Sequence, residues 1–483
     1  MRNTRIIGTI GPATSDEETL TQLIEAGLDI ARLNYSHGSL EEKEVLYKRI
    51  RKIEAEVGRP VGIMADLPGP KIRLGRFPGE VLLNRDDNVI LDCGIDASEV
   101  VEMPYRLPVT YPGLSVELQV DDPVLLADGL VRLKVDSTSG TTGGLVNCTV
   151  IDGGLISARK GVNVPHTVVN LPSIGEEDVV AMNHAMEHGA DFIAVSYVRS
   201  PEDLAPVNKA ISEAGVHTWV VAKIEHPAAL EKLSDILANC NAVMVARGDL
   251  GVEIPLEKVP AAQERIVQEG MARGLPVIIA TQMLESMIEN PRPTRAEVTD
   301  VATAIRQGAS CVMLSGETAT GQHPVTTVET MARIAVSVEE ESRKLANPPA
   351  LSAYRSTRAV ANAGVELAKG AEVDRLIVAT EHATAARLVA AYRPDIPVTA
   401  MTDRVRAVRK TTMIRGVDAV LVKEEKRSKA TIQSAVDIML GDGRLVNGNS
   451  IVAVTGSPLA ISGRTSAIRL LTIDHGGKLV DYE

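Results

Sequence analysis

One lysine and two acidic residues occur where charged side chains are costly to place. Lys223 interrupts the apolar run Trp-Val-Val-Ala, Glu225 stands two residues further on, and Asp249 follows the apolar run 242–246. A buried ammonium costs several kcal/mol unless it is paired, and strand residues two apart share a face. Two carboxylates with open positions suit Mg²⁺, which keeps water and substrate oxygens as its other ligands. These residues predict a cation that stabilises a developing anion, next to a divalent metal.

Each of these residues also has a purely structural interpretation. Lys223 could form an ion pair that only stabilises the fold, and Asp249 could cap a helix or be a solvated loop charge. Arg32 and Arg73 could grip phosphate oxygens with forked guanidinium groups, or form surface ion pairs. Gly248 would let the backbone approach an anion closely, although one glycine is weak evidence.

Eight short apolar or β-branched runs are predicted to be the strands that position these residues. A helical pattern follows each run, and Gly27, Gly189, Gly274 and Gly308 match the left-handed residue that ends a helix. Eight strand–helix units in about 250 residues predict a (β/α)₈ barrel, whose chemistry lies at the carboxyl ends of its strands. The runs are 5–10, 29–34, 61–67, 191–197, 218–224, 242–247, 276–281 and 310–315.

The barrel pattern is interrupted once and is followed by a second α/β pattern. Residues 71–164 are rich in turn signals and short alternating runs, which predict a small all-β lid inserted after the third strand. Helices at 356–369, 384–392, 404–414 and 429–441 then alternate with strands at 374–380, 397–402, 419–423, 450–455 and 467–473. The predicted domains are an α/β barrel (1–70 and 165–345), an all-β lid (71–164) and an α/β C-terminal domain (346–483), with Asn-Pro-Pro at 347–349 as linker.

The composition narrows the class of protein. The 483 residues are 45% hydrophobic and 24% charged, as in globular domains, and only 2% aromatic, which suits parallel strands packed with aliphatic side chains. The net charge of −12 excludes a general nucleic-acid binder. No apolar run reaches the roughly 18 residues of a membrane span, and the N-terminus does not resemble a targeting peptide. With four widely spaced cysteines, these features predict a cytoplasmic protein.

Five ordered segments resemble the signatures of the pyruvate kinase family. They are TRIIGTIGPAT, ARLNYSHG, AKIEHPAAL with VMVARGDLGVEIP, PVIIATQMLESMIENPRPTRAEVTDVATAI and VMLSGETATGQHP, and the match runs through nearly the whole chain. The resemblance implies the same three domains and a homotetramer. It also implies the last step of glycolysis, in which phosphoenolpyruvate passes its phosphoryl group to ADP to give pyruvate and ATP.

The resemblance implies a role for each residue at the strand ends. Lys223 would stabilise the transferring phosphoryl group and the enolate oxygen, while Glu225 and Asp249 would hold Mg²⁺ or Mn²⁺. The residues implied in catalysis, including proton relay, are Lys223, Arg73, Thr281, Ser315 and Glu317. Those implied in substrate binding are Arg32, Lys223, Gly248, Asp249 and Thr281. Those implied in nucleotide binding are Arg32, Asn34, His37, Arg73 and Lys160.

The end of the third strand departs from the family members that need K⁺. Those members usually read Asp-Thr-Lys-Gly-Pro-Glu, whereas residues 66–71 read Asp-Leu-Pro-Gly-Pro-Lys. The ammonium of Lys71 would supply the charge that K⁺ brings to this region, which resembles the subgroup that works without a monovalent cation. The alternative is that Lys71 is a solvated lysine at the lid hinge. The residues expected around the cation are Asn34, Ser36, Asp66 and Leu67.

The C-terminal domain departs from relatives that are activated by sugar bisphosphates. Glu381 lies in the segment that binds phosphate in those relatives and would repel it, which argues against fructose 1,6-bisphosphate as the effector. The segment from Ser462 to Thr465 could instead hold another phosphorylated effector.

Two other kinds of protein stay open as alternatives. One is another Mg²⁺-dependent barrel enzyme acting on enolpyruvate-type substrates, such as a class II-like aldolase, which would keep Glu225 and Asp249 but would not need Lys160. The other is a paralogue that binds effectors without catalysis, which the set of Lys223, Glu225, Asp249 and Thr281 disfavours.

Overall fold

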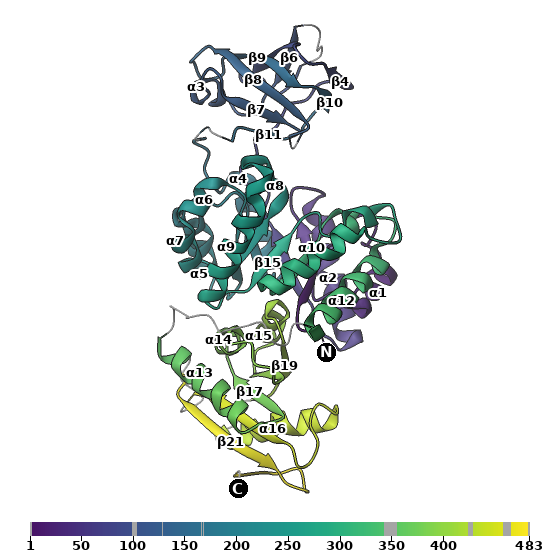
Figure 1. Ribbon diagram of the computed structural model, residues 1–483, viewed down its shortest axis with the longest axis vertical. Helices are drawn as coiled ribbons and strands as arrows, with labels where there is room; N and C mark the ends of the chain where they lie inside the picture. The colour runs from purple at the N-terminus through teal and green to yellow at the C-terminus, as the bar shows by residue number, and fades with distance from the viewer. Residues whose placement is uncertain are drawn as a thin grey trace.

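Eight parallel strands close into a barrel in the middle of the molecule, with the lid above it and the C-terminal domain below it (Figure 1). The computed structural model describes residues 2–98, 104–127, 129–165, 167, 169–341, 355–423, 428–456 and 465–481. Every barrel strand lies within one of the eight predicted runs, so the predicted fold class is confirmed. The strands are β1 (Arg5–Thr9), β2 (Ile30–Asn34), β3 (Gly62–Asp66), β12 (Phe192–Val195), β13 (Trp219–Ile224), β14 (Ala242–Ala246), β15 (Val277–Ala280) and β16 (Cys311–Leu314).

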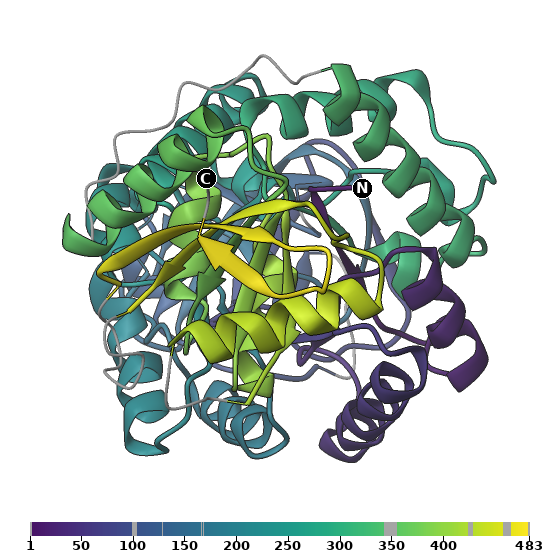
Figure 2. The ribbon, with the colours of Figure 1, turned by 90° about the horizontal axis from the view of Figure 1, so that it is seen from below.

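Helices form the outer layer of the barrel, as the view from below shows (Figure 2). Capping boxes at Ser39 and Thr294 begin two of them, and all four predicted helix-ending glycines have positive φ. No described helix is both long and apolar enough to cross a bilayer. The helices are α1 (Glu17–Ala26), α2 (Leu40–Val57), α4 (Glu176–Glu187), α5 (Ala205–Glu213), α6 (Pro227–Glu231), α7 (Leu233–Ala238), α8 (Arg247–Glu253), α9 (Val259–Ala272), α10 (Arg295–Gln307), α11 (Gly316–Ala319) and α12 (Pro324–Glu341).

The lid is a β structure with its own apolar core. Alternation of buried and exposed residues along its strands, as in β8, points one face of each strand into that core. Six strands form one sheet in the order β11-β7-β8-β9-β5-β6, and β10 pairs with β4. The elements are β4 (Glu80–Leu83), β5 (Asn88–Asp92), β6 (Tyr105–Pro108), α3 (Leu114–Glu117), β7 (Pro123–Leu126), β8 (Val131–Thr138), β9 (Leu145–Asp152), β10 (Gly154–Ser157) and β11 (Val162–Asn163).

The C-terminal domain is a six-stranded mixed sheet in the order β19-β18-β17-β20-β21-β22. The predicted helix 404–414 is shorter than expected, β19 starts two residues before the predicted strand 419–423, and β22 was not predicted. The linker predicted at 347–349 and residues 462–464 lie outside the described residues. The elements are α13 (Arg355–Gly370), β17 (Arg375–Ala379), α14 (Thr384–Ala391), β18 (Val398–Thr402), α15 (Val405–Lys410), the 3₁₀ turn η4 (Thr411–Met413), β19 (Val417–Leu421), α16 (Ser428–Gly441), β20 (Ser450–Thr455), β21 (Ala467–Ile473) and β22 (Leu479–Asp481).

The C-terminal domain docks on the end of the barrel where the strands begin. Trp219, the only tryptophan of the chain, starts β13, and two cations of the C-terminal domain lie against its ring. Arg387 Cζ is 5.8 Å and Lys410 Nζ is 5.6 Å from the ring centroid. Arg409 forms a 2.6 Å ion pair with Glu54 of α2. This domain is therefore far from the carboxyl ends of the barrel strands.

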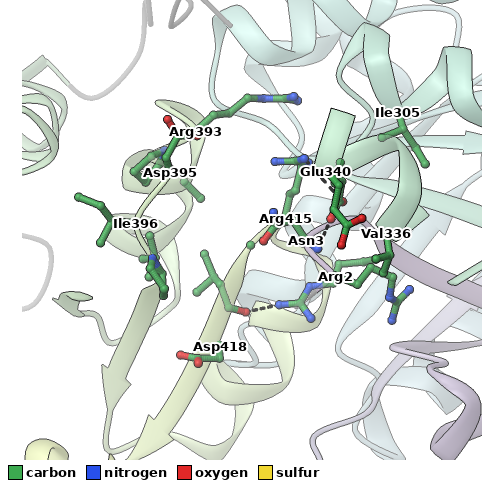
Figure 3. Close-up of a pocket in the computed structure, with 18 of the residues that line it drawn as sticks. Arg2, Asn3, Ile305, Val336, Glu340, Arg393, Asp395, Ile396, Arg415 and Asp418 are labelled. Carbon is green, nitrogen blue, oxygen red and sulfur yellow. Dashed lines mark hydrogen bonds and ion pairs between the residues drawn. The ribbon is translucent and has the colours of Figure 1, made fainter. Parts of the chain in front are cut away.

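A polar cavity of about 580 Å³ lies between the barrel and the C-terminal domain, near the start of the chain (Figure 3). Arginines line it from both domains, including Arg2 on one side and Arg415 on the other. Glu339, near the end of α12, accepts the backbone N–H of Asn3 at 2.7 Å and lies 3.6 Å from Arg415. An ion pair and hydrogen bonds from arginines to backbone carbonyls thus join the domains around this cavity.

Replacing Lys410 with methionine is expected to stabilise the folded protein at neutral pH. Burial lowers the pKa of the Lys410 ammonium from 10.5 to about 8, so the folded state binds this proton less tightly than the unfolded chain. The resulting penalty is complete below pH 8 and disappears as the pH rises towards 10.5. Because the contact with Trp219 offsets part of it, we expect a gain of about 1–2 kcal/mol.

Chemical unfolding followed by Trp219 fluorescence measures this effect. Between pH 7 and pH 10, the unfolding free energy of the unchanged protein should rise relative to that of Lys410→Met. Parallel curves for the two proteins would contradict the prediction.

Candidate active site

The ammonium of Lys223 lies between two carboxylates at the carboxyl end of the barrel. Its Nζ is 3.1 Å from Asp66 Oδ1 and 2.9 Å from Glu225 Oε1, and it donates a hydrogen bond to Ser196 Oγ at 2.7 Å. Burial by itself lowers the pKa of Lys223, but Asp66 and Glu225 outweigh burial, and the pKa is raised. The ion pair that the sequence left open is therefore present, and it holds a charged ammonium in place at the rim.

Asp66 joins this lysine to an arginine of the neighbouring strand. Arg32 donates through Nε to Asp66 Oδ2 at 2.7 Å and through Nη1 to Thr9 Oγ1 at 2.8 Å. Burial favours protonation of Asp66, yet Lys223 and Arg32 keep its pKa below the ordinary value. Asp66 is thus a buried anion that holds two cations of the rim in fixed positions.

Glu225 and Asp249, the two predicted metal ligands, lie on either side of Tyr197. The Tyr197 backbone N–H donates to Glu225 Oε2 at 2.7 Å, and its hydroxyl donates to Asp249 Oδ1 at 3.4 Å. Asp249 lies in the first turn of α8, a helix that the sequence did not predict. The N-cap of α8 is Ala246, so the alternative interpretation, in which Asp249 caps a helix, is wrong.

The donor set of these two carboxylates fits a divalent metal. Burial raises the pKa of Glu225, and repulsion from Asp249 raises it further, although Lys223 opposes both effects. A cation held between two repelling carboxylates would relieve that repulsion. Within the described ranges, no cluster of three or more His, Cys, Asp or Glu side chains could hold a metal. The protein would thus supply two oxygen ligands and leave the others to water and substrate, as Mg²⁺ prefers.

Lys71 reaches Asp249, one of the two predicted metal ligands. Its Nζ is 3.7 Å from Asp249 Oδ1. Its charge also lowers the pKa of His37, which follows the β2 end. Leu67 is buried and its backbone N–H donates to Ala194 O at 3.0 Å.

Thr281 has a strained backbone at the end of β15. Its φ is 69° and that of Gln282 is 54°, a left-handed conformation that is rare for a β-branched residue. Thr281 Oγ1 accepts the Gly248 N–H at 2.7 Å, and Arg247 donates to the Thr281 carbonyl at 2.7 Å. Arg247 is itself paired with Asp300 at 2.7 Å. These contacts hold the Thr281 hydroxyl against the first turn of α8.

Glu317 supports the backbone of the neighbouring strand ends. The side chain is fully buried, and its oxygens accept the N–H groups of Leu284 at 3.1 Å and Ser315 at 2.7 Å. The structure therefore connects Ser315 and Glu317 to the segment after β15 through backbone hydrogen bonds.

Cations gather over the loop between β2 and α2. Burial lowers the pKa of His37, and the charges of Arg73, Lys43, Arg32 and Lys71 lower it further. In the same loop, Asn34 Oδ1 accepts the Ser36 N–H at 3.0 Å. The loop is thus surrounded by positive charge from α2, β2 and the base of the lid.

Two predicted phosphate-binding residues lie at the base of the lid. Arg73 donates to the Arg159 carbonyl at 3.3 Å, and the Lys160 carbonyl accepts the Leu74 N–H at 2.8 Å. The Lys160 side chain is exposed. Because Arg73 and Lys160 belong to the lid, the distance of their side chains from the carboxyl ends of the barrel strands depends on the position of the lid.

The sequence did not single out several residues that organise this site. Tyr197 contacts both predicted metal ligands, Glu225 and Asp249, from a left-handed backbone (φ 52°), which no local pattern marks. Asn163 of β11 donates to Glu253 of α8 at 2.9 Å, and both are buried. This bond ties the lid to the helix that carries Asp249.

Comparison with known proteins adds independent findings. The family model "Pyruvate kinase, barrel domain" matches residues 1–328, and "Pyruvate kinase, alpha/beta domain" matches residues 358–471. The chain is 38% identical over 470 residues to the pyruvate kinase of Mycobacterium intracellulare, covering 97% of this chain and 98% of that protein. It is 38% identical over 471 residues to that of Mycobacterium tuberculosis strain H37Rv, with the same coverage. It is 36% identical over 474 residues to that of Staphylococcus epidermidis strain ATCC 12228, covering 97% of this chain and 80% of that protein.

Proposed function

The chain belongs to the pyruvate kinase family, the phosphotransferases of glycolysis, and from this premise we propose how its own residues transfer a phosphoryl group from phosphoenolpyruvate to ADP. The observation that carries the proposal is the Lys223 ammonium, held 2.9 Å from Glu225 and 3.1 Å from Asp66 at the strand ends. Phosphoryl transfer depends mainly on positioning and on neutralising charge, and this fixed cation supplies both.

We propose that phosphoenolpyruvate binds between Lys223 and Thr281. Lys223 stabilises the phosphoryl group as it leaves and the enolate oxygen that remains, and Arg32 and Arg73 contact phosphate oxygens. Thr281 and Gly248 bind the substrate carboxylate. Thr281, with Ser315 and Glu317 behind it, lies on the face from which a proton reaches the enolate carbon.

Glu225 and Asp249 would hold Mg²⁺ or Mn²⁺, which when bound neutralises charge on substrate and phosphoryl oxygens. ADP binds on the opposite side of the rim, against Arg32, Asn34, His37, Arg73 and Lys160. We further propose the domain bounds 1–70 with 165–345, 71–164 and 346–483. The homotetramer, a phosphorylated effector of the C-terminal domain and a cytoplasmic location stay predictions.

An assay that detects ATP formed from phosphoenolpyruvate and ADP tests the proposal. ATP should form only when both substrates and a divalent metal are present. Aldol-type cleavage or condensation without ATP formation would favour the alternative, another metal-dependent barrel enzyme.

We expect the enzyme to be active without K⁺, because the Lys71 ammonium provides a fixed positive charge at the rim. Activity in tetramethylammonium buffer should match activity in KCl. Lys71→Glu should lower activity about tenfold or more in tetramethylammonium and regain it when KCl is added, since the new carboxylate attracts the ion.

Lys71→Met is the matched control, because it removes the ammonium without creating a ligand for K⁺. It should lose activity in both salts, with a weaker response to KCl than Lys71→Glu. A strict K⁺ requirement in the unchanged enzyme would refute K⁺ independence.

A further inference from the structure

One lysine in the first turns of α2 is buried next to the site and has no role in the reaction described above. Lys43 is only 7% exposed. Lys48 and Lys52 of the same helix have side chains that are 73% and 54% exposed, and they pair with Glu44 and Glu17. No described residue accepts a hydrogen bond from Lys43 Nζ or forms an ion pair with it. Burial lowers the pKa of Lys43, and the nearby charge of Glu42 offsets only part of that effect, so the position of this ammonium needs an explanation.

The Lys43 ammonium lies directly under the loop that follows β2. A Cβ atom built on Gly38 would be 3.4 Å from Lys43 Nζ and 2.6 Å from Glu42 Oε2. Gly38 has a φ of 75°, and the absence of a side chain there leaves the ammonium close to the loop backbone. Lys43 Nζ is thus adjacent to the segment that carries Asn34 and His37.

The carboxylates near Lys43 already have other hydrogen-bond or ion-pair partners. Glu42 accepts the Ser39 N–H at 2.9 Å as part of the capping box of α2. Asp66 is shared by Arg32 and Lys223. The cations that converge on the loop therefore exceed the carboxylates available to them, which favours binding of a polyanion.

The arrangement favours the nucleotide over phosphoenolpyruvate as that polyanion. The charged groups that act on Lys43 are Glu42 and Arg32, and Lys43 in turn acts on His37. Neither Glu225 nor Asp249, the predicted metal ligands, is among the charged groups that act on Lys43. A compact ammonium can follow the phosphate oxygens of a flexible diphosphate as a point charge.

We propose that Lys43 binds the phosphates of ADP from beneath the loop of residues 34–38. This role rests on the proposed function, which places ADP on this side of the rim. The phosphates of ADP supply negative charge next to Lys43. The poor pairing of Lys43 in the free protein therefore increases the affinity for ADP.

Steady-state kinetics of three variants tests this role. Lys43→Met should raise the KM for ADP about tenfold and leave kcat and the KM for phosphoenolpyruvate within about twofold. Lys43→Arg keeps the charge and should recover most of the affinity for ADP. Lys48→Met removes an exposed lysine of the same helix and should change none of these constants.

Thermal unfolding gives a second readout that a purely structural lysine would not produce. Lys43→Met should melt at the same or a higher temperature than the unchanged protein, because it removes a largely desolvated charge that Glu42 offsets only in part. Added ADP should raise its melting temperature less than that of the unchanged protein.

An unchanged KM for ADP in Lys43→Met would overturn the proposal. The proposal would also be overturned if Lys43→Met melted at a lower temperature and raised the KM for ADP and the KM for phosphoenolpyruvate by the same factor. That pattern marks a structural role. Calorimetric titration of ADP separates this inference from the proposed function. Suppose that the unchanged protein makes no ATP but binds ADP, and that Lys43→Met binds ADP less tightly. The reaction assignment then fails, and the role of Lys43 stands.

Discussion

Lys223→Met is expected to lower kcat about 10³-fold, the largest effect of any single substitution that the structure predicts. The variant removes a cation that lies within 3.1 Å of both Asp66 and Glu225. A preorganised charge stabilises the developing enolate without reorganisation, and methionine has no group that can replace it. The effect should appear in kcat, while the KM for ADP should change little, because the residues proposed to bind ADP are all kept.

A lower stability accompanies this loss and must be measured separately. Asp66 keeps Arg32 as a partner and Glu225 keeps the Tyr197 N–H, so we expect a cost of about 1–3 kcal/mol rather than unfolding. Trp219 fluorescence and thermal unfolding report that cost. Calorimetric binding of ADP then shows whether the nucleotide side is intact. A folded Lys223→Met enzyme that turns over within tenfold of the unchanged one would disprove the proposed mechanism.

Glu225→Gln is expected to weaken binding of the divalent metal about 100-fold and to lower turnover by a similar or larger factor. Glutamine has nearly the same shape and can still accept the Tyr197 N–H, whereas the charge that pairs with Lys223 and would bind the metal is lost. The remaining carboxylate, Asp249, is shared with Lys71 at 3.7 Å and with the Tyr197 hydroxyl. It is therefore a poor substitute for the missing ligand.

Titration with Mn²⁺, followed by electron paramagnetic resonance, measures the metal directly and does not depend on activity. Glu231→Gln is the matched control, because it makes the same change at an exposed position on α6, close behind Glu225 in the chain. Its Mn²⁺ affinity should equal that of the unchanged protein. If Glu225→Gln binds Mn²⁺ as tightly as the control, Glu225 is not a metal ligand.

Local sequence patterns were sufficient to predict the barrel and the residues that lie at the carboxyl ends of its strands. An apolar run such as 242–246 becomes a strand because both of its faces are buried, and the helix that follows it packs on the outside. Once eight such runs close into a barrel, their carboxyl ends must meet, and this brings Lys223, Glu225 and Asp66 together. The lid strands were recognisable from alternation for the same reason.

The ends of helices and the residues with left-handed backbone conformations could not be predicted from local patterns. Helix α8 starts directly after β14, and the predicted helix at 404–414 gives way to a 3₁₀ turn at Thr411. The left-handed residues Tyr197 and Thr281 have side chains that normally avoid positive φ. Hydrogen bonds to the residue after β13 and to the first turn of α8 hold them there, and no nearby residue in the sequence signals those bonds.

The sequence by itself determined the alternation of strands and helices, the residue types at the strand ends and the family of the chain, because periodicity and motif order are properties of neighbouring residues. Only the tertiary structure decided which charges share a partner. Asp66 holds both Arg32 and Lys223, Lys71 lies against Asp249, and Lys43 is buried under a loop while Lys48 is exposed. The physical reason is that the energy of a charge depends on burial and on groups brought close by packing, often from distant parts of the chain.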